Sequence, residues 1–194
     1  MKTNKLRNLL DFIYAGEGLK RTVRHSWLSS GRRESVAEHT WRMAVMAIVL
    51  VPELDERVNL EKLLSIILVH DLAEAATGDR PAFKKSLVNK HDLEHEGLKQ
   101  IIKRLPLKTQ KHLLDLWSEF EDGVSIEAKI AHALDKTEVI IQHNQADLKT
   151  WTKKERLPAY STEYGLTYAT FNKVFREFRD LVRVDTAKKL GVTL

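Results

Sequence analysis

Apolar residues recur three or four positions apart along most of the chain, a spacing that places them on one side of a helix. This pattern predicts helices over residues 4–14, 36–51, 60–77, 86–104, 108–120, 126–144 and 165–190. Alternating spacing, which is typical of strands, is not the prevailing pattern. No repeat, low-complexity segment or linker divides the chain. We therefore expect one all-α domain, a helical bundle over residues 1–194, with its motifs between about 24 and 138.

Helix boundaries are marked by capping residues. Ser35 and Glu38 form a Ser-x-x-Glu capping box in front of a long apolar run, which Pro52 ends. Asn59 can cap the next predicted helix, and Gly78 follows its end. The segment that begins at Gly78, Gly-Asp-Arg-Pro-Ala-Phe, is predicted to be a turn.

The composition is that of a globular protein without cysteine chemistry. The chain has 194 residues, of which 43% are hydrophobic, and it contains no cysteine. Disulfides, thiolate metal sites and cysteine nucleophiles are therefore excluded. No apolar run is long enough to cross a bilayer, and the first residues lack a signal-peptide core and cleavage site. We therefore expect a cytoplasmic protein.

Positive charge is concentrated in the N-terminal part, where the basic residues include Lys20, Arg21, Arg24, Arg32 and Arg33. The formal net charge of the whole chain is +5. Such a cluster suits a polyanion or a phosphorylated small molecule. For any one of these residues, however, a solvated surface position is the simpler interpretation.

The segment Ile-Leu-Val-His-Asp-Leu-Ala-Glu carries polar side chains at the end of an apolar helix. His70 and Glu74 are four residues apart and Asp71 and Glu74 are three apart, so on a helix these pairs share a face. Asp79 follows shortly after. Burying ionised carboxylates is costly unless they are paired or bind a cation. Imidazole and carboxylate ligands suit zinc, manganese, iron or cobalt without selecting among them.

Two further polar residues lie in apolar helices. His39 is in the first turn of the helix over 36–51, and Asp135 interrupts the apolar run of the helix over 126–144. Taken singly, each is explained by a hydrogen bond or an ion pair in the core. Together with the residues at 70–74, they would give a bundle a metal site built from facing helices.

The order of His39, the pair His70-Asp71 and the distant Asp135 resembles the H…HD…D signature of the HD-domain metal phosphohydrolases. Four segments further resemble the YfbR-like 5′-deoxynucleotidase subfamily, in matching order and spacing within residues 5–145. These segments are 24–27, 34–39, 70–74 and 77–81.

The resemblance implies a ligand set for one divalent metal ion. It assigns His39, His70, Asp71 and Asp135 as the ligands, all of them on helices of an HD-type bundle. The identity of the ion stays open among cobalt, manganese, zinc, magnesium and iron.

The same resemblance implies roles near the metal. Glu74 corresponds to the residue that orients or activates the attacking water, and Asp79 to an acid of the substrate site. Arg24 corresponds to a phosphate contact. His25 stands where some relatives have tryptophan directly after this arginine, and Trp27 lies two positions on, so both are candidates for contacting the nucleoside.

The implied reaction is hydrolysis of a (deoxy)nucleoside 5′-monophosphate by a metal-activated water. One alternative keeps the chemistry and changes the substrate to a deoxynucleoside triphosphate, a cyclic nucleotide or a pyrophosphate-bearing alarmone. A different alternative, a protein that binds nucleic acid without catalysis, leaves the polar groups in apolar helices unexplained. The resemblance also implies a homodimer, because members of this family are dimers. The amphipathic C-terminal helix has more apolar positions than one buried face needs, which suits such an interface.

Other histidines are weaker candidates. The pair His91-Asp92 is followed by His95 at helical spacing, but polar residues surround it, which favours a solvated helix face. His132 could touch the site, although a packed or surface histidine is the more common case. No pattern points to a role for the remaining two, His112 and His143.

Overall fold

The computed structural model describes residues 2–79 and 90–194. Its longer helices are α1 (Lys2–Ala15), α3 (Val36–Leu50), α4 (Leu60–Val69), α6 (Lys90–Ile102), α7 (Leu107–Asp122), α8 (Ile126–Gln145) and α11 (Lys173–Leu190). Short helical turns are α2 (Gly18–Arg21), α5 (Glu74–Thr77), α9 (Pro158–Ser161), α10 (Leu166–Ala169), and the 3₁₀ turns η1 (Val51–Glu53) and η2 (Leu148–Thr150). The predicted all-α bundle is confirmed.

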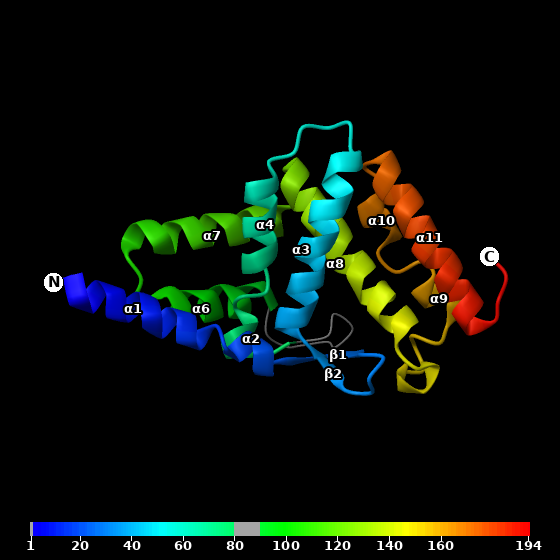
Figure 1. Cartoon of the computed structure of the whole chain (residues 1–194), viewed down its shortest axis with the longest axis horizontal. Coiled ribbons are helices and arrows are strands. Elements are labelled where there is room, and N and C mark those ends of the chain that lie inside the picture. The colour runs from blue at the N-terminus through cyan, green and yellow to red at the C-terminus, as the bar shows by residue number, and fades with distance from the viewer. Residues whose placement is uncertain (1, 80–89) are drawn as a thin grey trace.

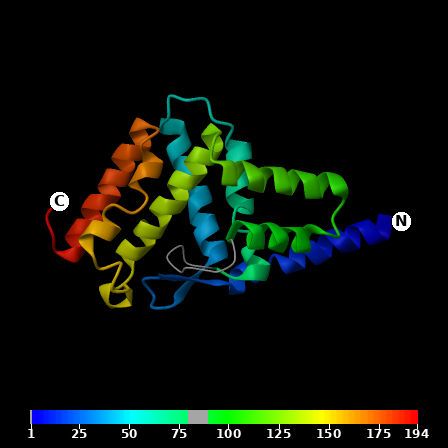
Figure 2. The same ribbon diagram turned by 180° about the vertical axis from the view of Figure 1, so that it is seen from behind.

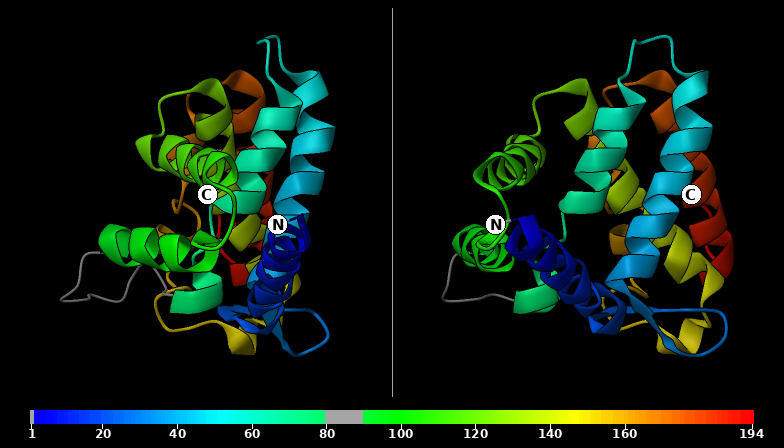
Figure 3. Two further views of the ribbon diagram at one scale, coloured as in Figure 1. Left: turned by 90° about the vertical axis from the view of Figure 1, so that its left-hand side faces the viewer. Right: turned by 60° about the vertical axis from the view of Figure 1, so that its left-hand side comes forward.

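Three helices form the centre of the molecule. The helices α3, α4 and α8 pack against one another, while α6 and α7 lie towards the N-terminal side and α9, α10 and α11 on the opposite side of α8 (Figures 1 and 2). Views from the side show α8 running behind α3 and α4 (Figure 3). Met43, Leu63, Ile66 and Leu134 are fully buried where the three helices meet.

The predicted caps at the helix starts are present. The Ser35 hydroxyl accepts the Glu38 backbone N–H, and the Glu38 carboxylate accepts the Ser35 N–H, which completes the capping box. The side chains of Asn59 and Ser125 accept the N–H groups three residues further on. These caps fix where α3, α4 and α8 begin and therefore which residues of each helix face the core.

The prediction of one continuous helix over residues 60–77 is wrong. α4 ends at Val69, residues 70–73 form turns, and α5 follows. The His70 ring bonds to the carbonyl of Ile67, and the next backbone bonds run from Leu72 to Val69 and from Glu74 to Asp71. The chain therefore tightens into turns with three-residue spacing where the helix ends.

Two other boundaries differ from the predictions. The helix predicted over 165–190 is divided into α10 and α11, because the Asn172 side chain accepts the Phe175 N–H and starts a new helix. The predicted helix over 86–104 corresponds to α6. Its residues 86–89 and the predicted turn at 80–83 lie outside the described residues.

A small hairpin was not predicted. β1 (Val23–Trp27) and β2 (Arg33–Ser35) pair antiparallel, with Val23 opposite Ser35 and Trp27 opposite Arg33. The hairpin runs directly into α3 and contacts α8 (Figure 1). Within the described ranges, no helix is both long enough and apolar enough to cross a membrane.

Candidate metal centre

The four predicted ligands come together from three helices. His39 lies in the first turns of α3, His70 and Asp71 directly follow α4, and Asp135 lies in the middle of α8. His39 Nε2 is 3.3 Å from Asp135 Oδ1 and 4.0 Å from Asp71 Oδ2, and His70 Nε2 is 3.2 Å from Asp71 Oδ2. Ligand atoms of His39, His70 and Asp135 all lie within 4.8 Å of one another.

A hydrogen bond at Nδ1 of each ring sets the orientation of the two histidines. The Nδ1–H of His70 donates to the carbonyl of Ile67 at 2.7 Å, and Nδ1 of His39 lies 2.5 Å from a carboxylate oxygen of Glu138. Because both partners accept, Nδ1 carries the hydrogen in each neutral ring and Nε2 keeps its lone pair. Both Nε2 atoms are buried and make no well-formed hydrogen bond within the described part of the chain. This arrangement fits a metal ion.

Negative charge surrounds His39. Burial opposes protonation of this ring and Arg24 repels the proton, but the carboxylates of Glu138 and Asp135 prevail and raise the pKa of His39 to about 9. A neutral histidine would leave these buried carboxylates short of positive charge. In the metal-free protein, the proton on His39 therefore supplies positive charge that a bound cation would otherwise supply.

The two aspartates are ionised. Burial alone would raise the pKa of Asp71, but His70, Arg24 and His39 hold it well below its usual range. Burial likewise opposes ionisation of Asp135, whereas Lys136, only 2.6 Å away, and His39 lower its pKa far more. Both carboxylates are therefore available as anionic ligands at neutral pH.

A small polar pocket opens beside the ligands. It is lined by Arg24, His25, Asp71, Glu74, Asp79, Lys90, Asp135, Lys136, Val139 and Tyr164. Glu74 is 3% exposed, and burial together with the charges of Asp71 and Asp79 raises its pKa to about 9. Its Oε2 has no hydrogen-bond partner among the described residues. Glu74 and Asp79 thus border the same pocket as the ligands.

The hairpin places Arg24 in this pocket. Arg24 lies on β1 and is buried between Asp71, at 3.5 Å, and Glu34 of β2, at 3.6 Å. Burial opposes the charge of the guanidinium, but Asp71 and the other carboxylates raise its pKa, so it stays positive. Burial and Glu138 raise the pKa of Glu34 to about 7.

Trp27 is not brought to the site. Its ring lies under the guanidinium of Arg33, 4.5 Å from the ring centre, at the far end of β1. It borders a separate hollow formed with residues 28–31 and with Asp147, Lys149 and Thr150. His25, two positions earlier on the strand, lines the pocket beside the metal ligands.

The other histidines lie elsewhere. His91 and Asp92 are exposed, as expected, but the rings of His91 and His95 pack against Trp117, with centroids 5.0 and 5.4 Å from it. The Nε2–H of His132 donates to the backbone carbonyl of Phe120 at 2.8 Å, and this histidine does not line the pocket.

Three residues that contact the site were given no role in the sequence analysis, namely Glu34, Lys136 and Glu138. Of these, Glu138 carried a usable signal: it follows Asp135 by three residues and so shares its face of the helix. Glu34 lies in a hairpin, where periodicity carries no information about the facing side chain.

Comparisons with known proteins show which family the chain resembles. A sequence profile of the HD domain family matches residues 16–178. The 5′-deoxynucleotidases HDDC2 of Bos taurus and Homo sapiens are each 41% identical over 142 residues, which cover 72% of this chain and 68% of each of those proteins. A solved structure from Magnetospirillum magnetotacticum, described as a "Predicted metal-dependent phosphohydrolase", covers 98% of this chain and 100% of its own with a TM-score of 0.84. At 23% identity it shows a shared fold.

The bond between Glu138 and His39 gives a prediction about metal affinity. Glu138→Gln keeps the volume of the side chain but removes the charge that orients His39 and raises its basicity. We expect the dissociation constant for Mn²⁺ to rise by roughly 10–100-fold, measured by calorimetric titration of metal-free protein. Glu127→Gln is the matched control, because Glu127 is also buried on α8 but pairs with Asn59 and Lys62. Equal affinity in the two variants would contradict the assigned role.

The raised pKa of Glu74 gives a prediction about stability. Folded metal-free protein keeps a proton on Glu74 that the unfolded chain releases above its ordinary pKa of 4.5. The contribution of this proton to the free energy of unfolding is therefore complete below pH 4.5 and is lost as the pH rises towards about 9. We expect metal-free Glu74→Gln to be more stable than wild type by at least about 1 kcal/mol at pH 8.5, and nearly equal to it at pH 4.5.

Urea unfolding at the two pH values measures this difference. Glu53→Gln, at an exposed glutamate, serves as the control and should leave the pH dependence of stability unchanged. A Glu74→Gln variant whose stability differs from wild type by the same amount at both pH values would refute the interpretation.

Proposed function

The chain belongs to the HD domain family, and we propose that it is a metal-dependent phosphohydrolase that converts deoxynucleoside 5′-monophosphates into nucleoside and phosphate. The observation that carries the proposal is the pair of buried imidazole Nε2 atoms, unpaired within the described part of the chain, that face two ionised aspartates beside an arginine-containing pocket. The relatives named 5′-deoxynucleotidase support the substrate class. A protein that only binds nucleic acid would have no use for this buried arrangement.

We assign the holding of one divalent ion to His39, His70, Asp71 and Asp135. Such an ion supplies an activated water and polarises a phosphoryl oxygen. The two imidazoles are oriented by Glu138 and Ile67, so their Nε2 atoms already point at the site before any ion arrives. The donor set suits manganese, cobalt, iron or zinc, and this proposal does not select among them.

Arg24 is assigned to the phosphate. Its guanidinium has a raised pKa and stays charged, and its Nε has no hydrogen-bond partner among the described residues. A guanidinium offers forked donors that match two phosphate oxygens. Because Arg24 is held between Asp71 and Glu34, it is already oriented before a substrate binds. The phosphate would therefore lie between Arg24 and the ligand cluster.

Glu74 is assigned to proton transfer. Hydrolysis joins a water oxygen to phosphorus and breaks the bond to the 5′ oxygen, so one proton must pass from the water to the leaving oxygen. The Oε2 atom of Glu74 is buried at the same pocket and free of other hydrogen bonds among the described residues. A carboxyl group with a raised pKa is suited to exchange a proton near neutral pH. Asp79 lies beside it and is assigned to positioning the substrate.

The proposed activity is tested by phosphate release. Deoxynucleoside and ribonucleoside 5′-monophosphates, a deoxynucleoside triphosphate and a cyclic nucleotide form the substrate panel, assayed after chelation and re-addition of single metals. We expect release from the deoxynucleoside monophosphates only in the presence of a divalent metal. Metal-dependent turnover of only the triphosphate or cyclic nucleotide would place the chain in the same family with another substrate.

We also propose that the protein is cytoplasmic, as the sequence analysis predicts.

The chain contains a matched pair of variants for this assay. Asp71→Asn removes a proposed ligand, whereas Asp92→Asn changes the acid of the exposed His-Asp pair on α6. We expect Asp71→Asn to lower kcat/KM by more than about 100-fold, since loss of partners outside the ligand set alone typically costs 10–100-fold. Asp92→Asn should keep wild-type activity. Full metal-dependent activity in Asp71→Asn would exclude this mechanism.

We further propose that the chain forms a homodimer through the outer face of α3. Trp41, Val45, Ile48 and Val49 follow helical spacing and are 39–64% exposed, so they form an apolar stripe on the side of α3 away from the core. A second copy of the chain could pair this stripe with itself in a two-fold arrangement.

Light scattering coupled to gel filtration tests the dimer. Trp41→Glu places a charge in the stripe, and we expect it to halve the mass measured for wild type. Leu107→Glu is the control, because Leu107 is 81% exposed at the start of α7 and outside the stripe. The same mass for wild type and Trp41→Glu would exclude this face as the interface.

A further inference from the structure

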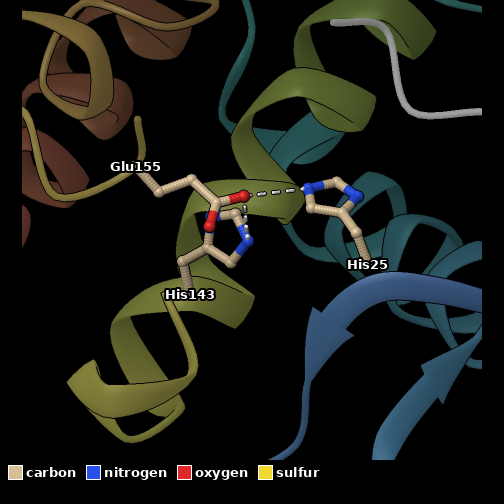
Figure 4. A group of neighbouring side chains, drawn as sticks. All are labelled: His25, His143 and Glu155. Atoms are coloured by element: carbon tan, nitrogen blue, oxygen red, sulfur yellow. Dashed lines mark ion pairs between the residues drawn. The ribbon is translucent and has the colours of Figure 1, made fainter. Parts of the chain in front are cut away.

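A second group of metal-ligating side chains lies apart from the four proposed ligands. His25 comes from β1, His143 from the last turn of α8, and Glu155 from the segment between η2 and α9. The three side chains converge from these separate elements on one place (Figure 4). Glu155 Oε1 lies 3.4 Å from His25 Nε2 and 3.6 Å from His143 Nε2.

These separations fit a shared ion better than hydrogen bonds. A hydrogen bond from an imidazole to a carboxylate is about 2.7–3.2 Å long, and both distances exceed that range. Two ligand atoms bound about 2.0–2.1 Å from a tetrahedral ion lie roughly 3.3 Å apart. The spacing of Glu155 Oε1 from each ring nitrogen is close to this value.

One buried carboxylate oxygen of this group lacks a partner among the described residues. His143 is 5% exposed and Glu155 is 3% exposed. Glu155 Oε1, the oxygen that faces both Nε2 atoms, nevertheless has no well-formed hydrogen bond within the described part of the chain. Leaving buried polar atoms unpaired costs free energy, and native proteins rarely do so without a further ligand.

Glu155 is held with one oxygen directed at the histidines. Its Oε2 accepts the N–H of Thr152 at 2.6 Å, and its own N–H donates to the Thr152 hydroxyl, a reciprocal pair like a capping box. These bonds use one carboxylate oxygen and leave Oε1 for the two rings. On the other side, the ring of Trp151 contacts the ring of His143 and donates its Nε1–H to the His143 carbonyl. The site is therefore built before an ion binds.

The two groups lie beside two neighbouring hollows and form separate sites. Asp135 and His143 are eight residues apart on α8, which corresponds to about 12 Å along the helix axis. That distance is too great for one ion to reach both, or for the pair of ions about 3.5–4 Å apart that share ligands in two-metal enzymes. His25, Val139 and Tyr164 line both the pocket at the first group and the hollow at the second.

We propose that His25, His143 and Glu155 bind a second divalent transition-metal ion, independently of the ion assigned to His39, His70, Asp71 and Asp135. Two imidazoles and one carboxylate are a ligand set suited to zinc, cobalt, manganese or iron. Three protein ligands would leave room for a further ligand, and the hollow that they line is also lined by Tyr160 and Tyr164. The proposal holds whether or not the chain hydrolyses nucleotides, because it concerns binding of the metal alone.

Counting bound cobalt tests the second site. Full-length protein is freed of metal, saturated with Co²⁺ and passed through gel filtration, and the tightly held ions are counted by elemental analysis. We expect two ions in wild type, one in His143→Gln, one in Asp135→Asn and none in the double variant. Visible absorption of the single-site variants separates the two cobalt environments.

Two further variants keep this test decisive. His25→Gln changes a partly exposed ligand on a strand, so its effect does not depend on repacking the core. It should also bind one ion. His91→Gln alters the histidine pair on α6 and should still bind two. One ion in wild type, or two in both His143→Gln and His25→Gln, would overturn the proposal.

Discussion

The hydrogen bond between His39 and Glu138 is the contact on which the arrangement of the site depends. Both side chains are fully buried between α3 and α8. An ionised carboxylate costs several kcal/mol to bury unless it is paired, so Glu138 needs both the His39 ring and Arg42, which approaches its other oxygen at 3.4 Å. The bond in turn sets the plane of the imidazole. Nε2 is thereby directed towards Asp135 rather than into the apolar core.

Burial and the neighbouring charges together set the pKa values of the site. Asp71, Asp135 and Glu138 are ionised because cations beside them outweigh the cost of burial. At Glu74, burial and the charges of Asp71 and Asp79 outweigh the opposing effect of Arg24 and Lys90, so this carboxyl group keeps its proton to about pH 9. A divalent cation at the site would favour the charged form of every carboxyl group near it.

Most of the site residues that could be predicted from the sequence pattern lie on helices. His39 and Asp135 stood out because a polar residue in an apolar helix disturbs a regular pattern, and the capping box at Ser35 fixed the position of His39 in its helix. The end of α4 at Val69 could not be predicted from helix propensity. It coincides with a hydrogen bond from the His70 side chain to the backbone carbonyl of Ile67, and propensity contains no information about such a bond. A role for Arg24 was implied by the family resemblance only. Its burial depends on a hairpin whose strands are too short to show alternation.

The second group of ligands illustrates the limit of such reasoning. His143 had no signal because its partners, His25 and Glu155, come from a strand far upstream and from a loop segment, and contacts over such separations leave no local pattern. The helix predicted over 126–144 already placed Asp135, Val139 and His143 at four-residue spacing along one face, but this spacing did not show which residues lie opposite His143. A rigid helix therefore carries one ligand of each group and fixes the distance between them. Because the helix cannot shorten, one ion could not be held by both His143 and Asp135, and the two proposed sites would each bind through their own ligands.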